Sequence, residues 1–165
     1  MREIYSLKLT MTIAISLVLS LILSVWPLPI WLWWFKPPWV LITLIYWVMF
    51  NPKRINVGVA FLLGLLVDGM SDSLLGIHAF AFVCITYLMC DWRRPLRKLS
   101  RTQQSIMVFA LACAYQFILF VLQAMMGSTP WGWHFWLPSL LTLPLWFLLS
   151  PLFSRYCAQH QEQMV

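Results

Sequence analysis

The sequence predicts an all-α membrane protein with about six transmembrane helices, and three observations lead to this class. Of its 165 residues, 62% are hydrophobic and 10% are charged, whereas soluble domains carry roughly 25% charged residues. The apolar residues gather in stretches with the lengths of helices. Eleven tryptophans and eleven phenylalanines are of the kind that collects at membrane interfaces. We therefore expect a single integral membrane domain over residues 1–165.

Six apolar stretches, separated by proline, glycine or charge clusters, are the predicted helices: 9–26, 38–50, 55–70, 74–90, 104–126 and 135–153. No small-x-small cleavage site follows the first stretch, so we interpret it as a mature helix and not as a signal peptide. The second and third are shorter than the roughly 20 residues that a span needs. We expect them to thin the bilayer, to extend through flanking residues or to lie against other helices.

The basic residues predict the orientation. With six passes, ten of the eleven lysines and arginines share one side, and only Lys36 lies opposite. By the positive-inside rule, we expect both termini of this multi-pass membrane protein to be cytoplasmic; a four-span arrangement is the minor alternative. Orientation, and not nucleic-acid binding, explains the net charge of +6. The residues predicted to set topology or contact anionic lipid are Lys53, Arg54, Arg93, Arg94, Arg97, Lys98 and Arg101, of which the last five could instead meet a cytoplasmic partner.

Two further patterns each have a packing explanation and a partner explanation. A stripe of small hydroxyl residues follows the first helix at a spacing of four, and such stripes let helices approach closely. Tryptophans gather around the two outer loops, as in an aromatic belt or as anchors for a partner. The candidate partner interface is therefore Thr12, Ser16, Ser20 and Ser24 together with Trp31, Trp33, Trp34, Trp131 and Trp133.

The stretch 64–76, "GLLVDGMSDSLLG", holds two of the five acidic residues, Asp68 and Asp72. In a continuous helix they would share one face as like charges, which is unfavourable. Gly69, Ser71 and Ser73 indicate that the helix ends near Asp68 and that the two serines cap the next helix, which begins near Leu74. We expect Asp68 to be structural, with hydrogen bonds to a neighbouring helix or loop, such as the backbone donors near Gly76.

Patterns for catalysis are missing. An intramembrane aspartyl protease needs a second carboxylate on another helix, and a CDP-alcohol phosphotransferase needs further spaced aspartates after its Asp-Gly. His78 and His134 stand in no serine or metal motif, and the four cysteines have no metal-ligand spacing. The sequence therefore predicts no enzyme, no metal and no cofactor.

Two segments carry a family resemblance: "KPPWVLITLIYWVMFNPKRINVG", 36–58, and "GLLVDGMSDSLLGIHAFAF", 64–82. Together with the layout of short loops and a basic link after the fourth helix, they resemble the bacterial rod shape-determining protein MreD family. Asp72 departs from the family pattern. The positions that match it are Pro38, Trp39, Tyr46, Trp47, Pro52, Arg54, Asn56, Gly58, Gly64, Asp68, Ser71, Ser73, Leu75 and Gly76.

The resemblance implies a bundle akin to the substrate-binding subunits of energy-coupling-factor transporters. It also implies a non-enzymatic scaffold of the cell-wall elongation complex that maintains rod shape. The implied direct partner is MreC, with RodA, penicillin-binding protein 2 and MreB reached through the complex, besides membrane lipids. The alternative is a transporter-type membrane subunit that binds a small molecule or lipid in a pocket lined by Asp68 and Gln116.

Overall fold

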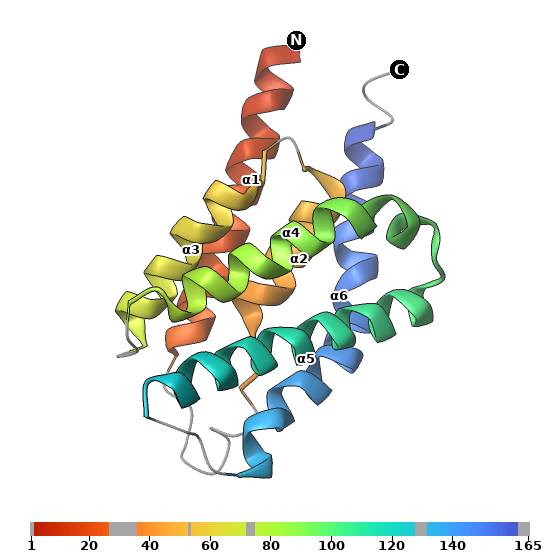
Figure 1. Ribbon diagram of the computed structural model, residues 1–165. Helices are drawn as coiled ribbons and strands as arrows, with labels where there is room; N and C mark the ends of the chain where they lie inside the picture. The colour runs from red at the N-terminus through yellow and green to blue at the C-terminus, as the bar shows by residue number, and fades with distance from the viewer. Residues whose placement is uncertain (1, 27–35, 53, 72–74, 128–131, 162–165) are drawn as a thin grey trace.

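The computed structural model describes residues 2–26, 36–52, 54–71, 75–127 and 132–161, and these are helical with no strand (Figure 1). The elements in order are α1 (Arg2–Val25), α2 (Trp39–Phe50), α3 (Val57–Met70), α4 (Ile77–Lys98), α5 (Arg101–Met125), the short 3₁₀ helix η2 (Trp133–Trp136) and α6 (Leu137–Gln161). The prediction of an all-α fold is confirmed.

The fourth helix differs most from its predicted range of 74–90. It begins at Ile77 and continues to Lys98, through Pro95 and the basic residues that were expected to form a link. The apolar run predicted only the part suited to a bilayer, whereas backbone hydrogen bonding continues into the polar segment. The basic cluster therefore lies on the last two turns of α4 and the start of α5.

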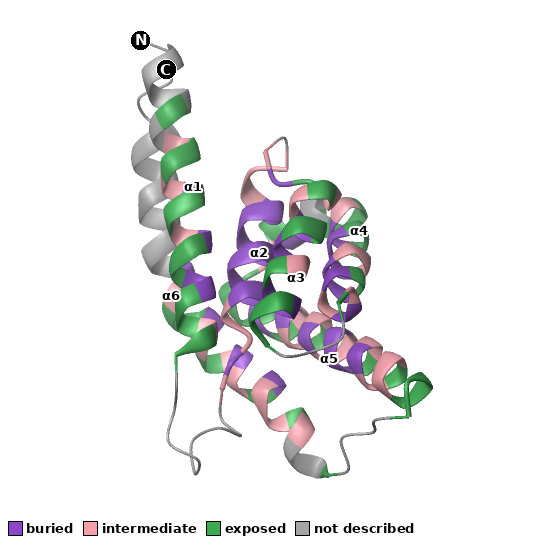
Figure 2. Ribbon diagram, turned by 90° about the vertical axis from the view of Figure 1, so that its left-hand side faces the viewer, coloured by how far each residue is buried: buried purple, intermediate pink, exposed green. Residues whose placement is uncertain are grey.

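Helix α2 is the centre of the molecule. Ten consecutive residues, Val40–Met49, are buried, and Figure 2 shows α2 almost entirely in the colour of buried residues. It contacts α1, α4 and α5. A helix of 12 residues is about 18 Å long, which is short for a hydrocarbon core of about 30 Å. Contact with other helices is one of the outcomes expected for a short helix, and α2 shows it.

By length and composition, α5 alone among the described helices is long and apolar enough to cross a bilayer. The other apolar helical segments have 10–17 residues. The start of α1, the α2–α3 connection and the end of α6 lie toward one end of the molecule in Figure 1. The end of α1, the start of α2, the end of α3 and the start of α4 lie toward the other. We call the second of these the distal end.

Candidate functional site

The carboxylate of Asp68 joins the end of α3 to the start of α4. Asp68 is 1% exposed. Its Oδ2 accepts hydrogen bonds from the backbone amides of Gly76 at 2.8 Å and Ala79 at 3.3 Å. Its Oδ1 accepts one from the amide of His78 at 3.0 Å and lies 2.7 Å from His78 Nδ1. An anion thus sits on the free amides at the positive end of a helix.

This arrangement corrects one prediction. Helix α4 has Gly76 at its N-cap, which has no side chain to accept a hydrogen bond. Ser71 instead ends α3 as its C-cap and its amide donates to the carbonyl of Asp68, so the prediction that Ser71 caps the fourth helix is wrong. Ser73 and Asp72 lie outside the described residues. The cap comes from the preceding helix because Gly76 adopts a φ of 104°, which turns the chain back toward Asp68.

Gly64 lies one turn before Asp68 on the same face of α3. A Cβ on Gly64 would lie 2.9 Å from the carbonyl carbon of His78 and closer still to the backbone of Ala79. Real side chains do not tolerate such distances, so glycine allows the backbones of α3 and α4 to touch. Because of this contact, the Asp68 carboxylate reaches the first turn of α4.

Asn56 and Gly58 lie at the other end of α3. Asn56 is the N-cap, and its side chain accepts a hydrogen bond from the amide of Val59 at 3.2 Å. Gly58 is exposed in the first turn. Asn56 thus caps the start of α3 from just outside the helix.

The central part of the hydroxyl stripe on α1 packs inside the bundle, where Ser16 contacts α2. Trp47 Nε1 donates to Ser16 Oγ at 2.7 Å, and Ser20 is 4% exposed with its hydroxyl on the carbonyl of Leu17. Thr12 and Ser24 are half-buried. Packing within the chain therefore accounts for Ser16 and Ser20. Of the tryptophan candidates, Trp31, Trp33, Trp34 and Trp131 and the side chain of Trp133 lie outside the described residues.

Gln116 joins α5 to the last helix. Its Nε2 donates to the carbonyl of Phe135 at 2.8 Å, and its Oε1 accepts a hydrogen bond from the hydroxyl of Ser139. Asp68 and Gln116, which the transporter-type alternative placed around one ligand, thus each hold a helix junction. Neither lines the two pockets described below.

Two of the basic residues bind within the chain. Arg97 Nε donates to the carbonyl of Met49 at 2.6 Å, its NH2 group donates to the carbonyl of Phe50, and its guanidinium lies 5.2 Å from the centre of the Phe50 ring. A cation therefore caps the C-terminus of α2. Arg54 donates to the hydroxyl of Thr10 in α1.

The remaining basic candidates are either exposed or lie outside the described residues. Lys98 and Arg101 are exposed. Lys53 and the side chains of Arg93 and Arg94 lie outside the described residues. The sequence predicts the same role for Arg97 as for these residues, because charge alone does not show which cation hydrogen-bonds a neighbouring helix.

Sequence reasoning also missed the polar joint between α4 and α5. Ser100 and Gln103 form a reciprocal capping box at the start of α5. Gln104 Nε2 donates to the carbonyls of Leu96 at 3.0 Å and Leu99 at 3.3 Å, which satisfies the end of α4. The Ser-x-x-Gln pattern at 100–103 is the signal that could have predicted it.

A hollow of about 440 Å³ opens at the distal end, between the end of α1, the start of α2, the end of α3, the start of α4 and the middle of α5. We call it the distal pocket. Its polar lining residues are Ser24, Lys36, Ser71, His78 and Tyr115, and its apolar ones include Val67, Met70 and Phe82. Partial burial lowers the pKa of the Lys36 amino group below its ordinary value. Among the described residues, no carboxylate forms a salt bridge with Lys36.

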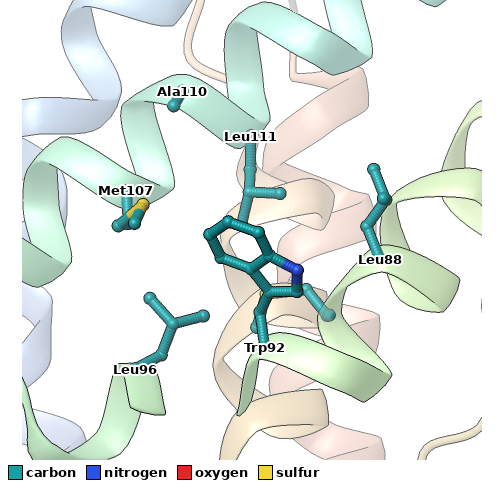
Figure 3. A pocket seen from close by; sticks show the side chains of 7 residues that line it. Leu88, Trp92, Leu96, Met107, Ala110 and Leu111 are labelled. Carbon is teal, nitrogen blue, oxygen red and sulfur yellow. The ribbon is translucent and has the colours of Figure 1, made fainter.

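A second pocket, of about 200 Å³, lies between α4 and α5 and is apolar. Figure 3 shows the Trp92 indole between the side chains of Leu88 and Leu96 on α4 and those of Met107 and Leu111 on α5. Trp92 is 56% exposed and Leu88 is 46% exposed, so the pocket opens on the outer surface of the bundle.

Several polar side chains of the described residues hydrogen-bond backbone groups of another element. The described residues include no group of three or more His, Cys, Asp or Glu side chains that could hold a metal ion. Asp68 and His78 are paired, but the carboxylate is shared with three backbone amides. What the arrangement does is hold helices together at buried junctions.

Comparisons with known proteins agree with the resemblance seen in the sequence. The family model described as "rod shape-determining protein MreD" matches residues 5–156. A curated Haemophilus influenzae protein named "Rod shape-determining protein MreD" is 29% identical over 152 residues, which cover 90% of this chain and 94% of the relative. No solved structure gives a significant match, so the likeness to energy-coupling-factor subunits stays a prediction. The chain therefore belongs to the MreD family of rod shape-determining proteins.

Proposed function

We propose that the chain is a non-enzymatic, multi-pass inner-membrane subunit of the cell-wall elongation complex, and that it scaffolds MreC and the peptidoglycan synthesis machinery. The observation that carries this proposal is the family match over residues 5–156, which supports a role in rod shape determination. In the proposal MreC is the direct partner, and RodA, penicillin-binding protein 2 and MreB are reached through the complex.

The use of the buried polar groups supports a scaffold over an enzyme. Asp68, Gln116 and Arg97 each hydrogen-bond backbone groups of another element. A general acid or base needs access to a substrate proton, whereas these groups face other parts of the chain. Their hydrogen bonds make a rigid bundle that can present an outer face to a partner helix.

Large apolar side chains cover the outer faces of the bundle. Ile15 of α1 is 67% exposed, Leu62 of α3 is 61%, Tyr87 of α4 is 66% and Phe117 of α5 is 57%. Such faces suit lipid and a transmembrane partner helix alike. By contrast, α2 is enclosed by the chain's own helices, so the single membrane helix of MreC has no access to it.

Photo-crosslinking in cells tests this proposal. A crosslinking amino acid at Ile15, Leu62, Tyr87 or Phe117 should capture MreC from at least one of these faces, and the same group at Ile45 in α2 should capture none. MreC should also co-purify with the wild-type chain in mild detergent, and depletion of the chain should turn rods into round cells. Rod-shaped cells after depletion, or the failure of MreC to crosslink and co-purify, would refute the proposal.

A further inference from the structure

We propose that the distal pocket binds the phosphate-bearing headgroup of an anionic lipid. The inference does not depend on MreC, because it rests on the lining and position of the pocket. Its volume of about 440 Å³ falls within the range of roughly 300–1,000 Å³ that is usual for small-molecule sites.

Charge in the pocket favours an anion. Lys36 lines it, and no carboxylate of a described residue neutralises this ammonium through a salt bridge. The buried carboxylate of Asp68 lies nearby, but it is occupied by the amides of α4 and by His78. A phosphate placed against Lys36 would make a charge-assisted hydrogen bond, which is stronger than one between neutral groups.

Neutral donors line the same pocket as Lys36. The hydroxyls of Ser24, Ser71 and Tyr115 belong to the lining, and hydroxyls can donate to phosphate oxygens or accept from headgroup hydroxyls. They come from α1, from the C-cap of α3 and from α5, respectively. A ligand that contacts all three would be held by elements far apart in the sequence.

The apolar part of the lining favours a lipid over a free anion. Val67, Met70 and Phe82 belong to the same pocket wall as the polar groups. A free phosphate would leave this surface unused, whereas a lipid places glycerol and acyl carbons against it. The pocket also lies where α1 and α3 end and where α2 and α4 begin.

The test is native mass spectrometry of the full chain in detergent with three probes: short-chain phosphatidylglycerol, short-chain phosphatidylcholine and inorganic phosphate. We expect saturable binding of phosphatidylglycerol and binding of phosphatidylcholine at least about tenfold weaker, because the choline ammonium opposes Lys36. Inorganic phosphate should not displace phosphatidylglycerol at equal concentration. Equal binding of both lipids, or phosphate binding as tight as that of the lipid, would overturn the proposal.

Two matched variants test whether the lipid binds in the distal pocket. Lys36→Gln should weaken phosphatidylglycerol binding by about tenfold or more, as expected for loss of a charged hydrogen bond. Lys98→Gln removes one exposed cation from the end of α4 and should leave binding unchanged. An equal loss in both variants, or none in Lys36→Gln, would refute the site.

Two milder variants test the site even if Lys36→Gln misfolds. Tyr115→Phe and Ser71→Ala remove only a hydroxyl, and each should weaken binding severalfold while the thermal midpoint stays near that of the wild type. Unchanged binding in both would contradict the site even if Lys36→Gln failed to fold. If a variant loses lipid binding but still associates with MreC, the proposed function is unaffected. If the chain binds the lipid but does not associate with MreC, the lipid site is unaffected.

Discussion

At the scale of single residues, Asp68 is the side chain on which most of the α3–α4 junction depends. A helix start in an apolar bundle exposes amides that water cannot reach, and each unsatisfied amide costs free energy. The Asp68 carboxylate accepts hydrogen bonds from three of these amides and also contacts the His78 ring. The carboxylate therefore stabilises the start of α4 and the turn that leads to it.

Asp68→Leu should lower the amount of folded protein. Leucine fills similar space but leaves three amides of α4 without their acceptor, at about 1–3 kcal/mol each. Fluorescence-detected size-exclusion chromatography in detergent should show a smaller monodisperse peak and a lower thermal midpoint. Asp68→Asn, which keeps one acceptor oxygen, should lie between Asp68→Leu and wild type.

The control is Asp91→Leu, because Asp91 is an exposed carboxylate in the second half of α4, away from the junction at the start of that helix. It should stay near the wild-type level. Full yield and an unchanged midpoint for Asp68→Leu, together with normal rod shape in cells, would refute the structural role of Asp68.

At the scale of elements, the helices approach each other closely where a small residue permits it. Gly64 of α3 touches the backbone of His78 and Ala79 at the start of α4. Two features of α3 therefore fix this junction. The missing side chain of Gly64 allows the close contact, and the Asp68 carboxylate hydrogen-bonds the first amides of α4. Arg97 works on the same scale, because it caps the enclosed α2 from the far end of α4.

Gly64→Ala should destabilise the protein by about 3 kcal/mol, the upper part of the range for overpacking, because the added methyl meets backbone and not a movable side chain. Gly69→Ala is the matched control, since nothing lies within 4 Å of a Cβ there. It should be neutral or stabilising by up to about 1 kcal/mol, as expected for alanine in a helix. Thermal midpoints in detergent would separate the two, and equal midpoints would contradict the close α3–α4 contact.

At the scale of the whole molecule, one enclosed helix is surrounded by others with apolar outer faces. The start of α1, the α2–α3 connection and the end of α6 lie toward one end. Near this end Arg54 donates to Thr10 of α1, and Arg97 donates to the carbonyl of Phe50, the last residue of α2. In the predicted topology this end is the cytoplasmic one.

Reporter fusions test that topology. Green fluorescent protein fused after residue 165 should fluoresce, because it folds in the cytoplasm, whereas alkaline phosphatase inserted at 128–131 should be active on the outer side. The same phosphatase inserted at Lys53 should be inactive. Phosphatase activity at Lys53, or a dark C-terminal fusion in cells that hold the full-length product, would contradict the predicted orientation.

The sequence by itself determined the all-α class, the approximate positions of six helices and the expectation of a buried Asp68, because apolar runs and rare charges are local signals. For Asp68 the sequence also predicted backbone donors near Gly76, and the structure shows the amides of Gly76, His78 and Ala79. Only the tertiary structure decided the more distant contacts. Arg97 caps α2 across 48 residues, and Trp47 donates a hydrogen bond to Ser16 of α1. The enclosure of α2 and the gathering of five segments around the distal pocket follow from how the helices pack in three dimensions. A pattern along one chain does not contain that information.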